Sequence, residues 1–146
     1  MRAVVLVFFF GSLLVSCREN EKQKNGSTVM QIPKDSSLFT NITWLDSTVR
    51  NFGTIPEGQK LEVTFRFLNS GTKPLIIAKV QPSCGCTIAE QPDEPVLPGK
   101  EGVIKASFNS EGRLGINHKK MYVYANTFGT QSNEVEFSVQ VAKKKW

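Results

Sequence analysis

Apolar and polar residues alternate along short stretches of the chain from Thr40 onward, and no stretch combines the 3.6-residue period of a helix with capping residues. Alternation with a period of two is typical of a β-strand that buries one face. The clearest example is residues 61–67, where apolar and polar side chains strictly alternate. The same pattern predicts further strands at residues 75–80, 103–108, 119–125 and 135–141, and weaker ones at 43–45 and 49–52.

Turn-forming residues separate these segments, among them Asn69-Ser70-Gly71, Pro98-Gly99 and the pair Gly112 and Gly115. About seven short strands with turns between them predict an all-β fold, an antiparallel β-sandwich of two sheets. Much of the core is expected to come from five phenylalanines, which are Phe52, Phe65, Phe67, Phe108 and Phe137.

Alternation also predicts which side chains of two strands face the core. The residues expected to face inward are Ile76, Ala78 and Val80 on one strand and Met121 and Val123 on the other. His118 would then point to solvent, on the same side as Lys120, Tyr122 and Tyr124.

The first residues have the features of a bacterial export signal. Arg2 precedes an apolar run at residues 3–15, which as a helix of about 1.5 Å per residue is about 20 Å long, shorter than the ~30 Å hydrocarbon core of a bilayer. That length fits a secretory signal rather than a membrane span. The run ends in Leu14-Val15-Ser16-Cys17, which resembles the lipobox of bacterial lipoproteins. The resemblance implies a cleaved signal peptide at residues 1–16 and a lipid anchor on Cys17.

Residues 17–37 are then expected to be the lipidated cysteine and a flexible tether, because polar residues dominate and too little apolar surface is present to fold. Residues 38–146 form the predicted domain. The position after Cys17 holds Arg18 rather than the aspartate that signals inner-membrane retention in some bacteria. We therefore expect a protein of the bacterial cell envelope, anchored to the outer membrane, with its domain in the periplasm or at the surface.

The composition restricts the function. The chain has 146 residues, of which 40% are hydrophobic and 21% charged, enough for one domain with one core. It contains a single histidine, His118, and lacks the nucleophile elbow, the phosphate-binding loop and the zinc-binding HExxH motif. These features predict a protein that is not an enzyme, with no cofactor and no small-molecule substrate. Nucleic acid is not expected as the partner of an exported lipoprotein.

Two cysteines remain once Cys17 is assigned to the lipid, and only Gly85 separates them. Cys84 and Cys86 on an extended strand would have Cα atoms about 6.5–7 Å apart, at the upper limit for a disulfide, and a bend at Gly85 would bring them closer. Three roles stay open. The pair can be a structural corner (bridged or free), a thiol-redox site, or a Cu(I) site, for which Met121 and His118 are the other candidate ligands.

Several blocks of the sequence resemble a bacterial family, the domain of unknown function 1573. They are Asn51-Phe52-Gly53-Thr54-Ile55-Pro56-Glu57-Gly58, Phe67-Leu68-Asn69-Ser70-Gly71, Pro74-Leu75, Ser83-Cys84-Gly85-Cys86-Thr87 and Pro98-Gly99, together with Gly115 and Asn126. The resemblance implies an immunoglobulin-like sandwich, often carried on envelope lipoproteins of the Bacteroidetes type. It implies no established activity.

Two functions therefore compete. The preferred hypothesis is a non-catalytic, membrane-anchored module that binds an envelope protein through its loops or a free sheet edge. The alternative is a thiol-redox or Cu(I)-binding protein that uses Cys84 and Cys86. In addition, Asp46-Ser47-Thr48 resembles a short O-glycosylation sequon, with Ser47 as the acceptor.

Overall fold

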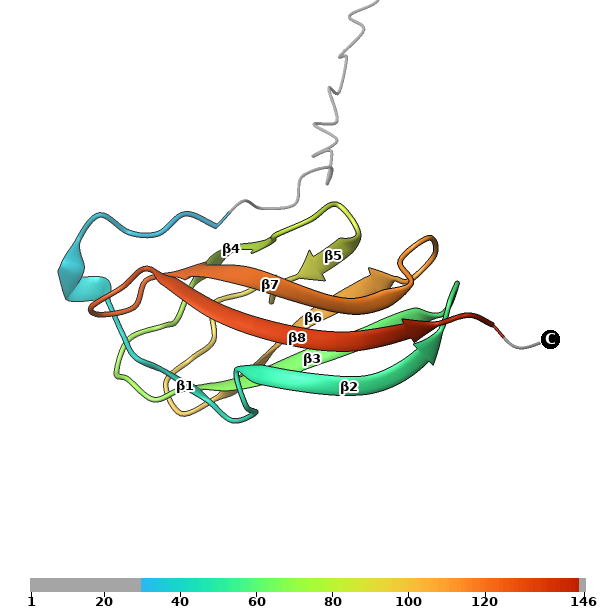
Figure 1. Ribbon diagram of the computed structural model, residues 1–146. Helices are drawn as coiled ribbons and strands as arrows, with labels where there is room; N and C mark the ends of the chain where they lie inside the picture. The colour runs from blue at the N-terminus through green and yellow to red at the C-terminus, as the bar shows by residue number, and fades with distance from the viewer. Residues whose placement is uncertain (1–29, 145–146) are drawn as a thin grey trace, which may run out of the picture.

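The structure is a computed structural model that describes residues 30–144. These residues form eight strands and one 3-10 helix, which are η1 (Ser36–Leu38), β1 (Ile42–Trp44), β2 (Val49–Pro56), β3 (Lys60–Asn69), β4 (Ile77–Pro82), β5 (Thr87–Glu90), β6 (Glu101–Asn109), β7 (Gly115–Ala125) and β8 (Ser132–Ala142). The strands form two four-stranded sheets in the orders β1-β3-β6-β5 and β2-β8-β7-β4, which pack as the two layers of a sandwich (Figure 1). The predicted all-β sandwich is therefore confirmed.

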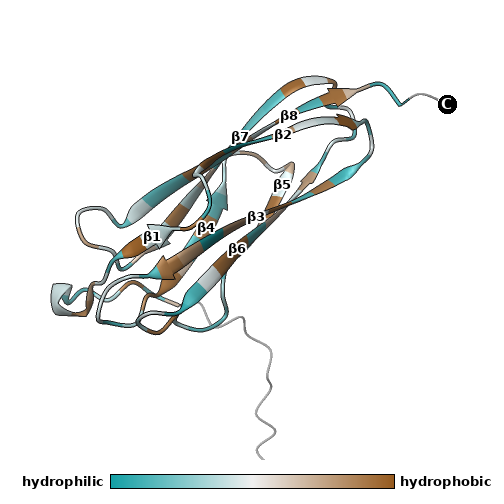
Figure 2. Cartoon of the chain, turned by 90° about the horizontal axis from the view of Figure 1, so that it is seen from below, coloured by the Kyte–Doolittle hydropathy of each residue, from teal (hydrophilic) through white to brown (hydrophobic). Residues whose placement is uncertain are grey.

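The core lies between the two sheets and follows the predicted alternation. Hydrophobic and hydrophilic positions alternate along the strands of both layers (Figure 2). Four of the five predicted core phenylalanines are at most 1% exposed, and the fifth, Phe52, is half-buried against them. Phe137 links the layers, because its ring contacts Phe108 at 6.0 Å and Phe52 at 6.1 Å in edge-to-face geometry. Met121 and Val123 face inward and His118 faces solvent, as predicted.

The pairing of the first and last long strands differs from the sequence-based prediction. β2 pairs with β8 in parallel, whereas every other strand pair is antiparallel. The chain leaves the first sheet after β1, crosses to the second sheet within residues 45–48, and places β2 beside the C-terminal strand. Alternation predicts a strand and its buried face, but it carries no information on which distant strand becomes the neighbour.

The sequence-based prediction differs from the structure in two further details, the buried face of β4 and the existence of β5. The predicted inward face of Ile76, Ala78 and Val80 is correct for Val80 and wrong for Ile76 and Ala78, because Ile77 and Val80 are the buried pair of β4. A register shift between Ile77 and Lys79 inserts an extra residue, and such a bulge reverses the alternation beyond it. The short edge strand β5 was not predicted, since its four residues are too few for a clear periodic signal.

Two buried asparagines hold the connections at one end of the sandwich. The Asn126 side chain accepts a hydrogen bond from the Ile76 amide (2.7 Å) and donates to the carbonyls of Leu38 (2.7 Å) and Pro74 (3.0 Å). The Asn69 side chain donates to the carbonyls of Lys73 and Val96 and accepts from the Thr40 hydroxyl and the Gly71 amide. Asn69 and Asn126, which both belong to the family resemblance, thus have a structural role.

The expected boundary between tether and domain, at residues 37 and 38, falls within η1. Within residues 30–144, no helix has the length and apolar character needed to cross a membrane. The predicted signal peptide and the predicted lipid-bearing Cys17 lie outside the described residues.

Candidate functional site

The segment of residues 83–87 forms the corner where the chain passes from β4 in one sheet to β5 in the other. Cys84 and Cys86 are joined by a disulfide bond, with their Cα atoms 5.4 Å apart. This separation is shorter than the about 6.5–7 Å of an extended strand, so the backbone bends between the two cysteines. We refer to this segment as the disulfide corner.

Hydrogen bonds fix both ends of the disulfide corner to neighbouring strands. The Ser83 amide donates to the Lys120 carbonyl on β7 (2.9 Å), and the Asn109 amide on β6 donates to the Cys86 carbonyl (3.1 Å). Cys86 is 8% exposed and belongs to the core, whereas Cys84 is half-buried at its border. The Cys84 sulfur lies 3.8 Å from the Thr87 hydroxyl. The two cysteines thus have different surroundings, and Cys84 is the more exposed residue.

Gly85 has no structural need to be glycine. Its φ is not positive, and a Cβ atom built on it would meet nothing within 4 Å. Each of the other eight described glycines either has a positive φ or would bring a Cβ atom within 3 Å of a neighbour. The backbone of the disulfide corner would therefore accept a side chain at residue 85. Because glycine has none, this position of the corner is exposed to solvent.

A hollow of about 250 Å³ lies beside Cys86 and carries positive charge. Its lining residues are Lys60, Gly85, Cys86, Ile88, Ser107, Asn109 and Arg113. Within residues 30–144, the side chains of Lys60 and Arg113 form no ion pair, and the buried hydroxyl of Ser107 has no hydrogen-bond partner. We refer to this site as the cationic hollow. Its two cations and the Ser107 hydroxyl can interact with an anion next to Cys86.

A third cation lies at the same end of the sandwich. The Lys119 ammonium group sits 5.5 Å from the centre of the Phe108 ring, and Phe108 pairs with Thr87 of the disulfide corner. Burial, followed by the positive charge of Arg113, lowers the pKa of Lys119. Three cations, Lys60, Arg113 and Lys119, therefore lie at this end of the molecule, where Glu57 also accepts a hydrogen bond from the Gly112 amide.

The single histidine belongs to a different surface. His118 is exposed on the outer face of β7, where Lys120 pairs with Glu134 (2.6 Å) and Glu136 (2.9 Å). Hydrogen bonding to Lys120 lowers the pKa of Glu136, and the charge of His118 adds to this effect. The hydrogen bonds that the Lys120 ammonium group donates to Glu134 and Glu136 raise the pKa of Lys120.

The other proposed copper ligand, Met121, is fully buried. Nowhere in residues 30–144 do three or more His, Cys, Asp or Glu side chains gather where they could hold a metal ion. While Cys84 and Cys86 are bonded to each other, neither offers a thiolate to Cu(I).

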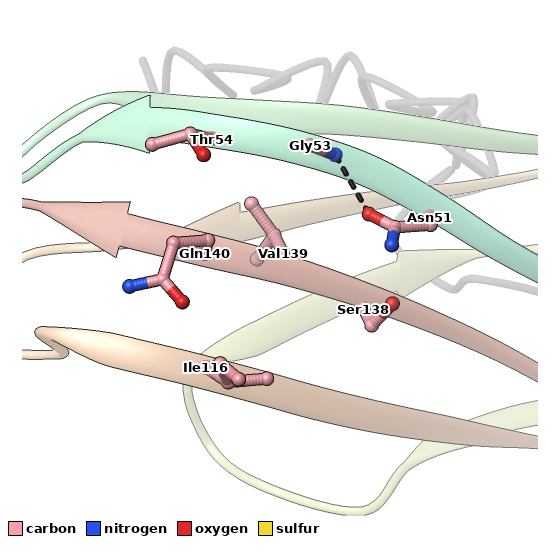
Figure 3. A pocket seen from close by; sticks show the side chains of 7 residues that line it. All are labelled: Asn51, Gly53, Thr54, Ile116, Ser138, Val139 and Gln140. Atoms are coloured by element: carbon pink, nitrogen blue, oxygen red, sulfur yellow. Dashed lines mark hydrogen bonds between the residues drawn. The ribbon is translucent and has the colours of Figure 1, made fainter.

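A second hollow, of about 230 Å³, lies on the outer face of β2, β8 and β7 (Figure 3). Asn51, Gly53 and Thr54 contribute from β2, Ser138, Val139 and Gln140 from β8, and Ile116 from β7. A register shift between Asn51 and Thr54 makes β2 bulge here, and the Asn51 side chain accepts a hydrogen bond from the Gly53 amide (2.8 Å). We call this site the neutral hollow, because none of the residues lining it is ionisable.

Sequence reasoning missed both hollows. Each is lined by residues from three strands that are distant in the chain, so no local pattern could reveal it. The available signal for the neutral hollow was Gly53, since a glycine inside a strand pattern often marks a bulge. The available signal for the cationic hollow was the Cys-Gly-Cys spacing alone.

At the beginning of the free edge of β2, the backbone groups form hydrogen bonds with a side chain. The Ser47 hydroxyl donates to the Val49 carbonyl (2.7 Å) and accepts from the Val49 amide (3.3 Å). Ser47, the residue of the sequon, is thus an exposed side chain that caps the beginning of this edge strand.

The profile of the family described as "Protein of unknown function (DUF1573)" matches residues 42–141, and the chain belongs to this family. The match covers nearly the whole described sandwich and confirms the resemblance seen in the sequence. A search of curated proteins finds no match.

Solved structures confirm the immunoglobulin-like fold. A protein of unknown function from Porphyromonas gingivalis W83 has a TM-score of 0.63 at 14% identity, covering 73% of this chain and 49% of that one. The ASH/PapD-like domain 7 of human CEP192 has a TM-score of 0.53 at 14% identity, covering 80% of this chain and 94% of that one. The Vibrio cholerae protease VesB has a TM-score of 0.53 at 13% identity, covering 70% of this chain and 32% of that one. The chain thus spans about half of the Porphyromonas protein and a third of the protease.

Proposed function

We propose that this chain is a non-catalytic, immunoglobulin-like binding module of the bacterial cell envelope, tethered to the outer membrane by lipid on Cys17. It binds a protein partner through the neutral hollow. The observation that carries this proposal is the exposed Ile116 beside a concave group of uncharged hydrogen-bonding side chains.

The sheet edges are poorly suited to capture a partner strand. The edge strands β1 and β5 have three and four residues. β4 contains a bulge and ends at Pro82, which lacks an amide donor. β2 is the longest edge strand, but it is bulged at Gly53 and its first groups are capped by Ser47. These features protect edges against pairing in many β proteins. These features therefore support a strand face as the binding surface, in place of the loops or free sheet edge of the sequence-based hypothesis.

The neutral hollow combines an apolar anchor with hydrogen-bonding groups. Ile116 is 70% exposed, the most exposed of the large hydrophobic side chains in the described chain. Asn51, Thr54, Ser138 and Gln140 supply amide and hydroxyl groups around it. Uncharged groups of this kind match the amides and uncharged side chains of a polypeptide. No aromatic ring lines the hollow to stack on a sugar, so a polypeptide fits better than a glycan.

The proposal can be tested by site-specific photocrosslinking of the full chain in its bacterial host. A crosslinker at Ile116 should give a discrete protein adduct, while one at Thr64, exposed on the outer face of the opposite sheet, should give none. Replacing Ser138 by Arg (S138R) should abolish the adduct by filling the hollow with a long charged side chain.

The matched control is T64R, which adds the same charge to the other face and should leave the adduct at residue 116 unchanged. Adducts of equal yield at both positions, or an adduct insensitive to S138R, would refute the neutral hollow as the binding site. If purified saccharides protect Ile116 from crosslinking and no protein adduct forms, the partner is a glycan and the proposal is wrong.

A further inference from the structure

We propose that the Cys84–Cys86 disulfide is a thiol–disulfide exchange site, in which Cys84 is attacked by an incoming thiolate and Cys86 leaves as a thiolate stabilised by the cationic hollow. This activity goes beyond the proposed binding function and does not depend on it. The co-reactant is a thiol, either a small thiol such as glutathione or an exposed cysteine of another protein.

The disulfide corner is accessible for such an attack. Cys84 is half-buried at the border of the core, whereas Cys86 is 8% exposed. Gly85 between them is exposed, and neither its φ nor its surroundings require glycine. An absent side chain at this position leaves space for an approaching thiolate. A disulfide bond with a purely structural role would not require that space.

The surroundings of the two sulfur atoms set the direction of the reaction. Cys86 lines the cationic hollow together with Lys60 and Arg113, neither of which has an ion-pair partner within residues 30–144. The Ser107 hydroxyl in the same hollow lacks a hydrogen-bond partner and can donate to an anion. Neighbouring cations lower the pKa of a thiol, and a leaving thiol of lower pKa departs faster.

Acidic residues near this site include Glu57, Glu62 and Glu111, and none of the three lines the hollow. The Glu57 carboxylate accepts a hydrogen bond from the Gly112 amide (3.1 Å) next to Arg113, and Glu111 is two residues before Arg113. Glu62 is opposite Ser107 on β3, but it does not line the hollow. Lys60, two residues earlier on the same strand, does line it. The two ionisable side chains that line the hollow together with Cys86, Lys60 and Arg113, are therefore both cationic.

The proposed exchange takes place in two steps. A thiolate RS⁻ attacks the sulfur of Cys84, the bond between the two cysteine sulfurs breaks, and its electron pair leaves on Cys86 as a thiolate. The product is a mixed disulfide between R and Cys84. A second thiolate attacks the R sulfur, releases the disulfide RSSR, and leaves Cys84 as a thiolate. In total, two thiols are oxidised to one disulfide, and Cys84 and Cys86 are reduced by two electrons and take up two protons.

The test measures reduction of the full chain, purified in detergent, by glutathione, with intact mass and thiol counting as the readout. In the double variant K60M/R113M, we expect reduction about tenfold slower than in the wild type. If the equilibrium constant for reduction of the disulfide by glutathione falls by the same factor, the reduction potential of the Cys84–Cys86 disulfide falls by about 30 mV. The control is K105M, which removes a lysine from the outer face of the same sheet but outside the hollow. Equal rates for K60M/R113M and K105M would overturn the proposal, as would a disulfide that glutathione reduces only after the protein unfolds.

A second measurement separates this role from a structural one. In the C84S variant, the pH profile of Cys86 alkylation should show a thiol pKa below that of an ordinary cysteine, and adding K60M/R113M should raise it again. An unchanged profile would contradict the proposal. The Ile116 adduct should persist in C84S/C86S, so the exchange site and the proposed binding function can fail independently.

Discussion

At the scale of single residues, the glycines within residues 30–144 divide into those that backbone conformation or packing requires and one that neither requires. Gly102 is required by packing, since an added Cβ atom would lie 2.4 Å from a ring carbon of Phe67. Gly85 is unconstrained in both space and φ. The contrast indicates that the glycine of the disulfide corner serves accessibility rather than folding.

Alanine substitutions test this contrast directly. We expect G85A to keep the disulfide and to raise the free energy of unfolding by about 0.4–1 kcal/mol, because alanine reduces the entropy of the unfolded chain where the native φ permits it. G102A should lower it by about 1–3 kcal/mol through overpacking against Phe67. Urea unfolding, with intact mass to verify the disulfide, measures both. A G85A variant as destabilised as G102A would show that Gly85 is needed by the fold.

At the scale of elements, buried asparagines join segments that hydrophobic packing alone does not hold. Asn126 follows β7 directly and binds the η1 segment, the loop after β3 and the residue before β4. Backbone groups in such connections need partners when water is excluded. One amide side chain satisfies three of them and fixes the end of the sandwich opposite the C-terminus (Figure 1).

Removing the Asn126 side chain should therefore lower the stability of the folded protein. We expect N126A to lower the free energy of unfolding by about 3 kcal/mol, since a buried donor or acceptor left unpaired costs about 1–3 kcal/mol. N41A, at an exposed asparagine on the neighbouring segment, should change it by less than about 0.5 kcal/mol. Chemical denaturation of both variants measures the difference. Equal free energies of unfolding for N126A and N41A would mean that water replaces the Asn126 amide without loss of stability.

The disulfide corner also acts at the scale of elements. It carries the chain from an edge strand of one sheet to an edge strand of the other, and Cys86 packs into the core between them. The loop closed by this disulfide spans a single residue, so it constrains few unfolded conformations and stabilises little. The placement of the bond beside a cationic hollow is thus more informative than its contribution to stability.

At the scale of the whole molecule, the proposed lipid anchor on Cys17 would set how far from the membrane the binding surface can act. The polar composition after Cys17 predicts a flexible tether, which would have a reach of about 25 Å. The neutral hollow and the cationic hollow lie on different faces of the sandwich, so two partners could be engaged from one anchored molecule.

Substitution of the anchor residue tests localisation. We expect wild-type protein in the membrane fraction of the bacterial host and C17S in the soluble envelope fraction, because a serine hydroxyl cannot take the thioether-linked lipid. The folded sandwich should be the same in both, as judged by circular dichroism. Membrane retention of C17S would show that something other than the lipid holds the protein.

The comparison of prediction with structure separates local from non-local information. The strands at residues 61–67, 103–108 and 135–141 were predicted because each has strict alternation of apolar and polar residues over several positions. The short β5 and the bulge in β4 were not, since one is too short to show a period and the other changes phase within six residues.

The sequence by itself determined the fold class, the core phenylalanines and the exposed position of His118, because each depends on the period-two pattern of a strand. It also identified Cys84 and Cys86 as the residues of interest. Only the tertiary structure decided the parallel pairing of β2 with β8 and the meeting of Lys60, Arg113 and Ser107 at Cys86. The physical reason is that side-chain alternation is a property of one strand, whereas a binding site is formed by strands that the chain brings together from distant positions.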